Sequence, residues 1–219
     1  MPTIQLSQRL VSFLLFLPTF FISITIHEFA HAFSASKLGD DTAKKQGRLT
    51  FNPIKHADLI GTVIMPLASF ASGFALIGWA KPVPVNRNNF KNQLRDDAVV
   101  SFAGPLSNFF LAIIFFVGFL IILNLEFRYQ HYLLNIFWYG VFLNIFLCLF
   151  NLLPIPPLDG SHILFDLFPN KITAIILNFG LYGSILLLIL IYSPLWGFFM
   201  KFINLILNLF LGIAGLNNG

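Results

Sequence analysis

The sequence predicts an all-α, polytopic membrane protein that folds as a helical bundle. Hydrophobic residues make up 57% of the chain and charged residues only 10%, whereas a soluble domain carries about 25% charged residues. Mean hydropathy is +0.82. Several charge-free windows also reach the roughly 20 residues that a helix needs to cross a bilayer. We therefore expect about five to six membrane segments, and we exclude a soluble domain, a disordered chain and a coiled coil.

The expected membrane segments follow the charge-free windows along the chain. The second window contains several glycines and a proline and runs into the Pro-rich stretch Trp79–Pro84. Such a sequence favours a re-entrant loop over a full crossing, although membrane helices tolerate both residue types. A Ser193-Pro194 break separates the last two helices. The windows are Leu10–Ser36, Leu59–Ala80, Ala98–Leu125, Tyr132–Leu158, Ile172–Tyr192 and Leu195–Ala214.

Two polar stretches, Lys37–Asp58 and Lys81–Asp97, connect the first three windows. A turn signal at Gly39–Asp41 precedes Arg48–Phe51, where we expect a short β-like element. No repeat or appended soluble domain is visible. We therefore expect a single membrane-embedded domain over residues 1–219, with a core at about 10–168 and C-terminal helices at about 172–214. The first window is too long for a signal peptide.

Charge and cysteine usage narrow the class of protein further. The net charge is +4, but the 13 Lys and Arg residues lie between apolar windows. Membrane topology explains this distribution better than a nucleic-acid partner does. The single cysteine, Cys148, excludes an intramolecular disulfide framework and a Cys-based zinc site. We interpret it as a small buried residue.

The chemistry of the chain begins with His27-Glu28-Phe29-Ala30-His31, an HExxH motif inside the first apolar window. Residues four apart share one face of a helix, so both imidazoles can bind one Zn²⁺. Glu28 is then placed to act as the general base for a water molecule. Three ionisable groups within one turn of a membrane helix are costly, and such groups normally serve a function.

A catalytic zinc ion usually takes three protein ligands, so a third must come from elsewhere in the chain. Asp159 is a candidate because it ends a long apolar window and follows Pro154, Pro156 and Pro157, which bend the chain. From the residues alone, Asp159 serves equally well as the N-cap of a following helix. Two other candidates are His162, as a ligand or a supporting group, and His56, but a histidine in such a position is more often an ordinary loop residue.

Three sequence motifs, which follow one another in the family's order, resemble those of the site-2 protease family of intramembrane zinc metalloproteases. They are His27–His31 as HExxH, Gly104-Pro105-Leu106-Ser107-Asn108 as GPxxN, and Asn151 through Asp159-Gly160 as NxxPxPxLDG. The stretches Asn52–Gly61 and Gly78–Asn86 are similar to a small bacterial and archaeal branch of this family. The resemblance spans roughly residues 20–165, and it includes no PDZ or CBS domain.

The resemblance implies roles for particular residues. His27, His31 and Asp159 would be the ligands of one Zn²⁺ per chain, and Glu28 would be the base. Asn108 and Asn151 would help to position the substrate strand or the reacting carbonyl group. The family also implies that the substrates are membrane proteins or peptides cleaved within or beside the bilayer.

A shared metal site constrains the topology. His27 and Asp159 lie at the C-terminal ends of their windows, so those two spans should run in the same direction, and Ala98–Leu125 in the opposite one. Leu59–Ala80 must then enter and leave on one face. Only Arg9 and Arg128 fall on the other side, which indicates that the shared side is cytoplasmic. The basic residues on that side are Lys37, Lys44, Lys45, Arg48, Lys55, Lys81, Arg87, Lys91, Arg95 and Lys171.

We therefore expect a zinc metalloendopeptidase in the cell membrane, with several spans and an active site towards the cytoplasm. Its substrates would be membrane-spanning or membrane-associated, and nucleic acid is not an expected partner. The alternative is a zinc transporter or a metal-binding membrane protein without proteolytic activity, since His and Asp within helices also build permeation sites. That alternative leaves Glu28 without a role.

Overall fold

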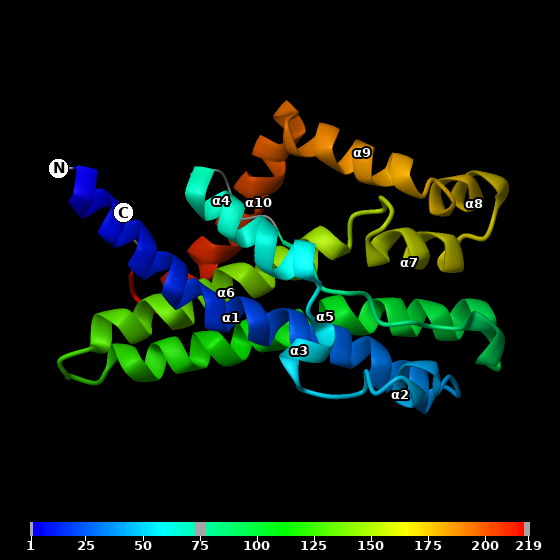
Figure 1. Cartoon of the computed structure of the whole chain (residues 1–219), viewed down its shortest axis with the longest axis horizontal. Coiled ribbons are helices and arrows are strands. Elements are labelled where there is room, and N and C mark those ends of the chain that lie inside the picture. The colour runs from blue at the N-terminus through cyan, green and yellow to red at the C-terminus, as the bar shows by residue number, and fades with distance from the viewer. Residues whose placement is uncertain (1, 73–77, 217–219) are drawn as a thin grey trace.

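The computed structural model describes residues 2–72 and 78–216, which form helices and loops without a strand. Four of these helices are long and apolar enough to cross a membrane, and a sharply bent pair of shorter helices allows a fifth span. The expected all-α bundle is confirmed. The four long helices, drawn in Figure 1, are α1 (Pro2–Lys37), α5 (Gln93–Leu123), α6 (Gln130–Asn151) and α10 (Pro194–Ile213).

The directions of α1, α5 and α6 follow from which residues pair across them. His27 of α1 contacts Asn108 of α5, and the later His31 contacts the earlier Val100, so α1 and α5 are antiparallel. Between α1 and α6 the pairs are Phe16 with Tyr139 and Ser23 with Asn144, so these two helices are parallel. Figure 1 shows the same arrangement, with α5 returning beside α1 and α6 turning back again. These are the directions that a shared metal site requires.

An aromatic and aliphatic core joins α5, α6 and α10. Gly140 lets the ring of Phe115 approach the backbone of α6, and the rings of Phe116 and Phe210 lie edge to face with centroids 4.8 Å apart. Such contacts contribute both buried apolar area and specific ring geometry. The buried members are Leu111, Ala112, Phe115, Phe116, Phe119, Val141, Ile145, Ile203 and Leu207.

The second apolar window returns to the place where it began. It forms a π-helix, η1 (Leu59–Ile64), followed by α4 (Met65–Ser72). The Trp79 amide then donates to the Gly61 carbonyl at 3.1 Å, and the Thr62 hydroxyl donates to the Trp79 carbonyl at 2.8 Å. The two ends of this segment are therefore hydrogen-bonded together, as the expected re-entrant loop requires. Gly73, which belongs to the same window, lies outside the described residues.

The β-like element expected at Arg48–Phe51 does not form, and residues 49–51 are bends. The chain there has no neighbouring strand to pair with. Instead, the Thr50 carbonyl accepts a hydrogen bond from Nε2 of His56 at 2.8 Å, and Phe51 stacks on Phe29 of α1. The same loop contains two single-turn helices, α2 (Thr42–Lys45) and α3 (Pro53–His56).

Two expected helices are shorter than the apolar windows that predict them. The window Tyr132–Leu158 stops being helical at Asn151, and its prolines form a loop before α7 (Asp159–Leu167) begins. The next window breaks into α8 (Lys171–Leu177) and α9 (Leu181–Ile191), which meet at 83°. Hydropathy measures the apolar environment of a segment and does not detect a change of helix direction within it. The Ser193-Pro194 break is confirmed, since the Ser193 hydroxyl accepts from the Leu195 amide at the start of α10.

Candidate active site

The HExxH residues occupy the last turns of α1 and face the interior of the bundle. His27, Glu28 and His31 are each only 8% exposed. The Nε2 atoms of the two histidines lie 3.0 Å apart. As the i, i+4 spacing predicts, one helix face presents both imidazoles to the same point.

Asp159 reaches the same point from the first turn of α7. Its Oδ2 lies 3.3 Å from Nε2 of His27, and its Oδ1 lies 3.4 Å from Nε2 of His31. The helix begins at Asp159 itself, and the Asp159 side chain does not cap it. The N-cap interpretation left open by the sequence is therefore replaced by a contact with both histidines.

The three side chains fit a tetrahedral metal ion. Zinc with bonds of about 2.0–2.1 Å holds its ligand atoms about 3.3 Å apart. The two Nε2 atoms lie 3.0 Å apart, and each lies 3.3 or 3.4 Å from one of the two Asp159 oxygens. The ligand atoms of His27, His31 and Asp159 all lie within 4.8 Å of one another. The buried Asp159 Oδ2 makes no hydrogen bond. A buried carboxylate oxygen without a donor is costly, and a cation would satisfy it.

The other ring nitrogen of each histidine is held by an acceptor. Nδ1 of His27 lies 2.6 Å from Oδ1 of Asn108, and Nδ1 of His31 lies 2.8 Å from the Val100 carbonyl oxygen. An acceptor at Nδ1 places the proton there and leaves a lone pair on Nε2 of the neutral ring. Both lone pairs then point to the position between the histidines and Asp159.

Gly104 of α5 makes room for the two imidazoles. A Cβ atom at this position would lie 2.6 Å from Cε1 of His27 and closer still to Nε2 of His31. Any side chain would therefore displace the rings. The glycine of the GPxxN motif lets α5 pack directly against the metal-binding face of α1.

The carboxylate of Glu28 is held by the chain that leaves the re-entrant segment. Oε2 of Glu28 accepts a hydrogen bond from the Val83 amide at 2.8 Å. Val83 lies between Pro82 and Pro84, which have no amide hydrogen, so it supplies the only backbone donor of this tripeptide. The buried Arg48 holds the same stretch through the Lys81 and Pro82 carbonyls. Residues 81–83 are therefore held beside the base.

The remaining sequence candidates lie in other surroundings. His56 is fully buried and bonds the Thr50 carbonyl, so it belongs to the loop after α2. Nδ1 of His162 lies 3.3 Å from Oδ2 of Asp97, on a neighbouring ion-pair cluster. Asn108 is fully buried behind His27, where its amide group contacts other protein groups. Asn151 is half-buried and donates to the Leu147 carbonyl of its own helix.

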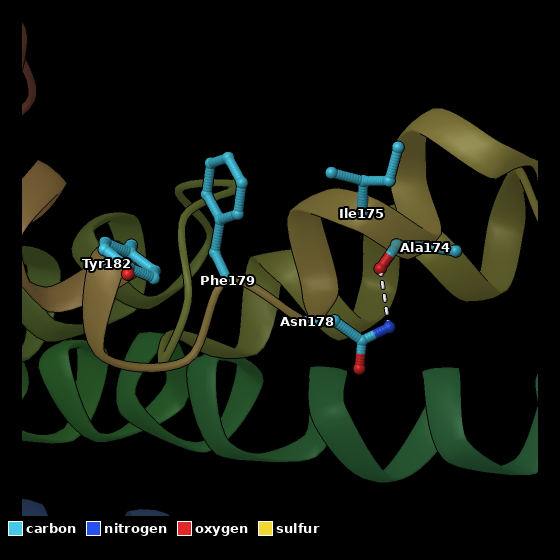
Figure 2. A pocket seen from close by; sticks show the side chains of 5 residues that line it. All are labelled: Ala174, Ile175, Asn178, Phe179 and Tyr182. Carbon is cyan, nitrogen blue, oxygen red and sulfur yellow. Dashed lines mark hydrogen bonds between the residues drawn. The ribbon is translucent and has the colours of Figure 1, made fainter.

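An open hollow on the bend between α8 and α9 is a different feature, drawn in Figure 2. Its lining includes Ala174, Phe179 and Tyr182. The amide of Asn178, which also lines it, donates to the Ala174 carbonyl at 2.8 Å. The hollow contains none of the metal-site residues and presents mostly apolar surface.

A helical membrane bundle that brings an HExxH helix and an aspartate from another helix together defines a membrane-embedded zinc metalloprotease. The model of Peptidase family M50 matches residues 15–129 and 118–191, and the chain belongs to this family. Membership in a peptidase family favours the metalloprotease over the transporter as the interpretation of the site. No solved structure matches the chain.

Named relatives agree with this assignment. A Bacillus subtilis protein named "Putative zinc metalloprotease YwhC" is 45% identical over 185 residues, which is 81% of this chain and 80% of the relative. A Mycolicibacterium smegmatis protein is named "Putative zinc metalloprotease Rip2". It is 32% identical over a region that covers 68% of this chain and 55% of the relative. The chain is therefore a site-2-protease-like zinc metalloprotease with several membrane helices.

Several residues around the site have no signal in a single sequence. Asn144 and Ser23 lie in apolar windows, and Val83 contributes only its backbone. Arg87 looks like any basic loop residue until α7 is placed beside it. Their roles depend on which helices are neighbours, and hydropathy carries no information on that point.

Proposed function

We propose that this metalloprotease is an intramembrane endopeptidase in which His27, His31 and Asp159 hold the zinc ion and Glu28 is the general base. One observation carries the proposal: three ligand atoms converge within 4.8 Å, and Glu28 is the next residue after the first ligand. Bound zinc would polarise the scissile carbonyl group and acidify a water molecule. The residues of the chain account for the remaining steps.

Glu28 takes the proton of the attacking water and later gives it to the leaving amine. The Val83 amide holds one oxygen of the carboxylate and so sets its direction. A carboxylate has two oxygens, so the second serves the proton transfer. The low exposure of Glu28 limits competing water around the reacting groups.

The proposed substrates are membrane-spanning or membrane-associated chains. A helical substrate must unwind locally, because its carbonyl groups are hidden in i to i+4 hydrogen bonds. Its freed backbone groups then need partners in a site poor in water. Asn151 lies at the end of α6 and is proposed as such a partner. Its Oδ1 atom would accept a hydrogen bond from the substrate backbone. The buried position of Asn108 favours a supporting role for its side chain, behind His27.

We also propose that the protein lies in the cell membrane with the site towards the cytoplasm. The loops next to the C-terminal end of α1 carry most of the basic residues, including Lys44, Lys45 and Lys55. Positive loops face the cytoplasm in most membrane proteins. Asp159 and the histidines lie at that end of α1 and α6.

Replacing the base tests the mechanism. Glu28→Gln keeps all three ligands, so the variant should retain zinc while cleavage of co-reconstituted single-span membrane proteins falls by about 10²–10⁴-fold. The matched control is Glu126→Gln, since Glu126 is the other glutamate of the chain and is exposed between α5 and α6. A Glu28→Gln variant that cleaves at the wild-type rate removes the proposed mechanism.

A further inference from the structure

A buried line of amide groups runs from α6 through α5 to the first histidine. Nδ1 of His27 contacts Oδ1 of Asn108 at 2.6 Å. Nδ2 of Asn108 donates to Oδ1 of Asn144 at 2.8 Å. Both asparagines are fully buried. The line therefore joins three helices inside the apolar part of the bundle.

Two groups at its far end decide which way each amide points. Nδ2 of Asn144 donates to the Gly140 carbonyl and to the Ser23 hydroxyl, each at 2.8 Å. The Gly140 carbonyl can only accept. The Ser23 hydroxyl gives its own proton to the Thr19 carbonyl at 2.6 Å, so it also accepts from Asn144. The nitrogen of the Asn144 amide must therefore face these two groups.

This orientation determines the proton position on His27. With its nitrogen facing Gly140, Asn144 turns its oxygen towards Asn108. Asn108 must then present its nitrogen to Asn144 and its oxygen to His27. An acceptor at Nδ1 requires the Nδ1–H form of His27, which leaves the Nε2 lone pair for the metal ion. His31 needs no such line, because a backbone carbonyl performs the same task directly.

We propose that Asn144 is a positioning residue of the zinc site, acting through Asn108 to hold His27 in the ligating form. The proposal rests on the proposed function only in taking His27 as a zinc ligand. Two fully buried amides in a membrane bundle cost free energy unless each is hydrogen-bonded. Their mutual hydrogen bonds remove this cost, and the line they form ends on a metal-binding ring.

Zinc affinity tests this proposal independently of proteolysis. Asn144→Leu removes the polarity of the line while keeping a side chain of similar size. The Asn108 amide then loses its short 2.8 Å hydrogen bond and keeps only the long 3.4 Å contact of its nitrogen with the Ser23 carbonyl. Zinc affinity should therefore fall by about 10–100-fold, as for other supporting groups of metal ligands. The measurement is zinc competition with a chelator on purified protein in detergent. Asn135→Leu, the same substitution on α6 outside the line, should bind zinc like the wild type.

A second substitution separates positioning from packing. Asn108→Asp places a carboxylate beside His27, which accepts from Nδ1–H in either orientation. Adding it to Asn144→Leu should restore most of the zinc affinity, whereas a packing defect at position 144 would persist. If leucine prevents folding, Asn144→Ala carries the same expectation.

Two results would overturn the proposal. One is a folded Asn144→Leu or Asn144→Ala protein that binds zinc as tightly as the wild type. The other is a folded Asn108→Asp, Asn144→Leu protein that binds as weakly as the single variant. Neither result depends on Glu28. The proposed role of Asn144 can therefore be wrong while the proposed protease mechanism is right, and the mechanism can be wrong while the role of Asn144 is right.

Discussion

Gly104 shows at the scale of single residues how two helices share a metal site. His27 and His31 are predictable from the sequence because ligands four residues apart share a helix face. The need for a glycine opposite them is not predictable from spacing, because it depends on the approach of α5 to α1. The same holds for Asn144, whose hydrogen bonds with Asn108 and Ser23 become visible only once three helices are packed.

Gly104→Ala should abolish zinc binding. The added Cβ would overlap the imidazole positions of His27 and His31, so both rings would have to leave the ligating geometry. Zinc content of the purified variant is the measurement. Gly197→Ala is the control, because nothing lies within 4 Å of its added Cβ and alanine favours a helix by about 0.5–1 kcal/mol. An alanine variant at position 104 with a full equivalent of zinc would contradict this packing.

At the scale of elements, an ion-pair cluster holds α7 where Asp159 can reach the histidines. Arg87 of η2 (Arg87–Asn89) pairs with Asp166 near the end of α7, and its Nε lies 3.0 Å from Oδ2 of Asp97 on α5. Hydropathy predicted which segments of the chain form helices. It did not predict this connection, since the apolar windows say nothing about which polar loop lies over which helix.

The cluster should make stability depend on pH. Burial, together with the hydrogen bond and charge of Asp97, raises the pKa of Asp166 from 3.8 to about 7, against the opposing charge of Arg87. A carboxyl group with a raised pKa stabilises the fold fully below its unfolded pKa and loses that contribution as pH rises through its folded pKa. The free energy of unfolding should therefore fall between about pH 4 and pH 7.

Asp166→Asn should flatten this dependence, because the variant has no proton to lose. Thermal unfolding in detergent at pH 5 and pH 8 measures the effect. The wild type should lose more stability between the two values than the variant does, whereas Glu126→Gln should follow the wild type. Equal losses in the wild type and Asp166→Asn would show that Asp166 does not titrate in this range.

For the whole molecule, the direction of each span follows from the metal site. The sequence predicted that α1 and α6 run in one direction and α5 in the other, because His27 and Asp159 had to meet. That argument succeeded since a metal ion imposes a distance between residues far apart in the chain. No metal site constrains the bend between α8 and α9, and hydropathy alone predicted the two helices as one span.

Cysteine labelling tests this topology in intact cells. In a Cys148→Ser background, single cysteines replace the exposed residues Gln46, Asn88 and Asn124. An impermeant thiol reagent should label position 124 and neither of the other two, because the re-entrant segment returns to the side it left. Labelling at position 88 without labelling at position 46 would mean that residues 59–80 cross the membrane.

The identity of the third ligand is the central claim, and zinc content tests it most directly. Asp159 lies 3.3 and 3.4 Å from the two histidine nitrogens, whereas His162, one turn further along α7, contacts Asp97. Purified Asp159→Ala should lose bound zinc, and purified His162→Ala should retain a full equivalent. A zinc-replete Asp159→Ala protein beside a zinc-free His162→Ala protein would contradict the account.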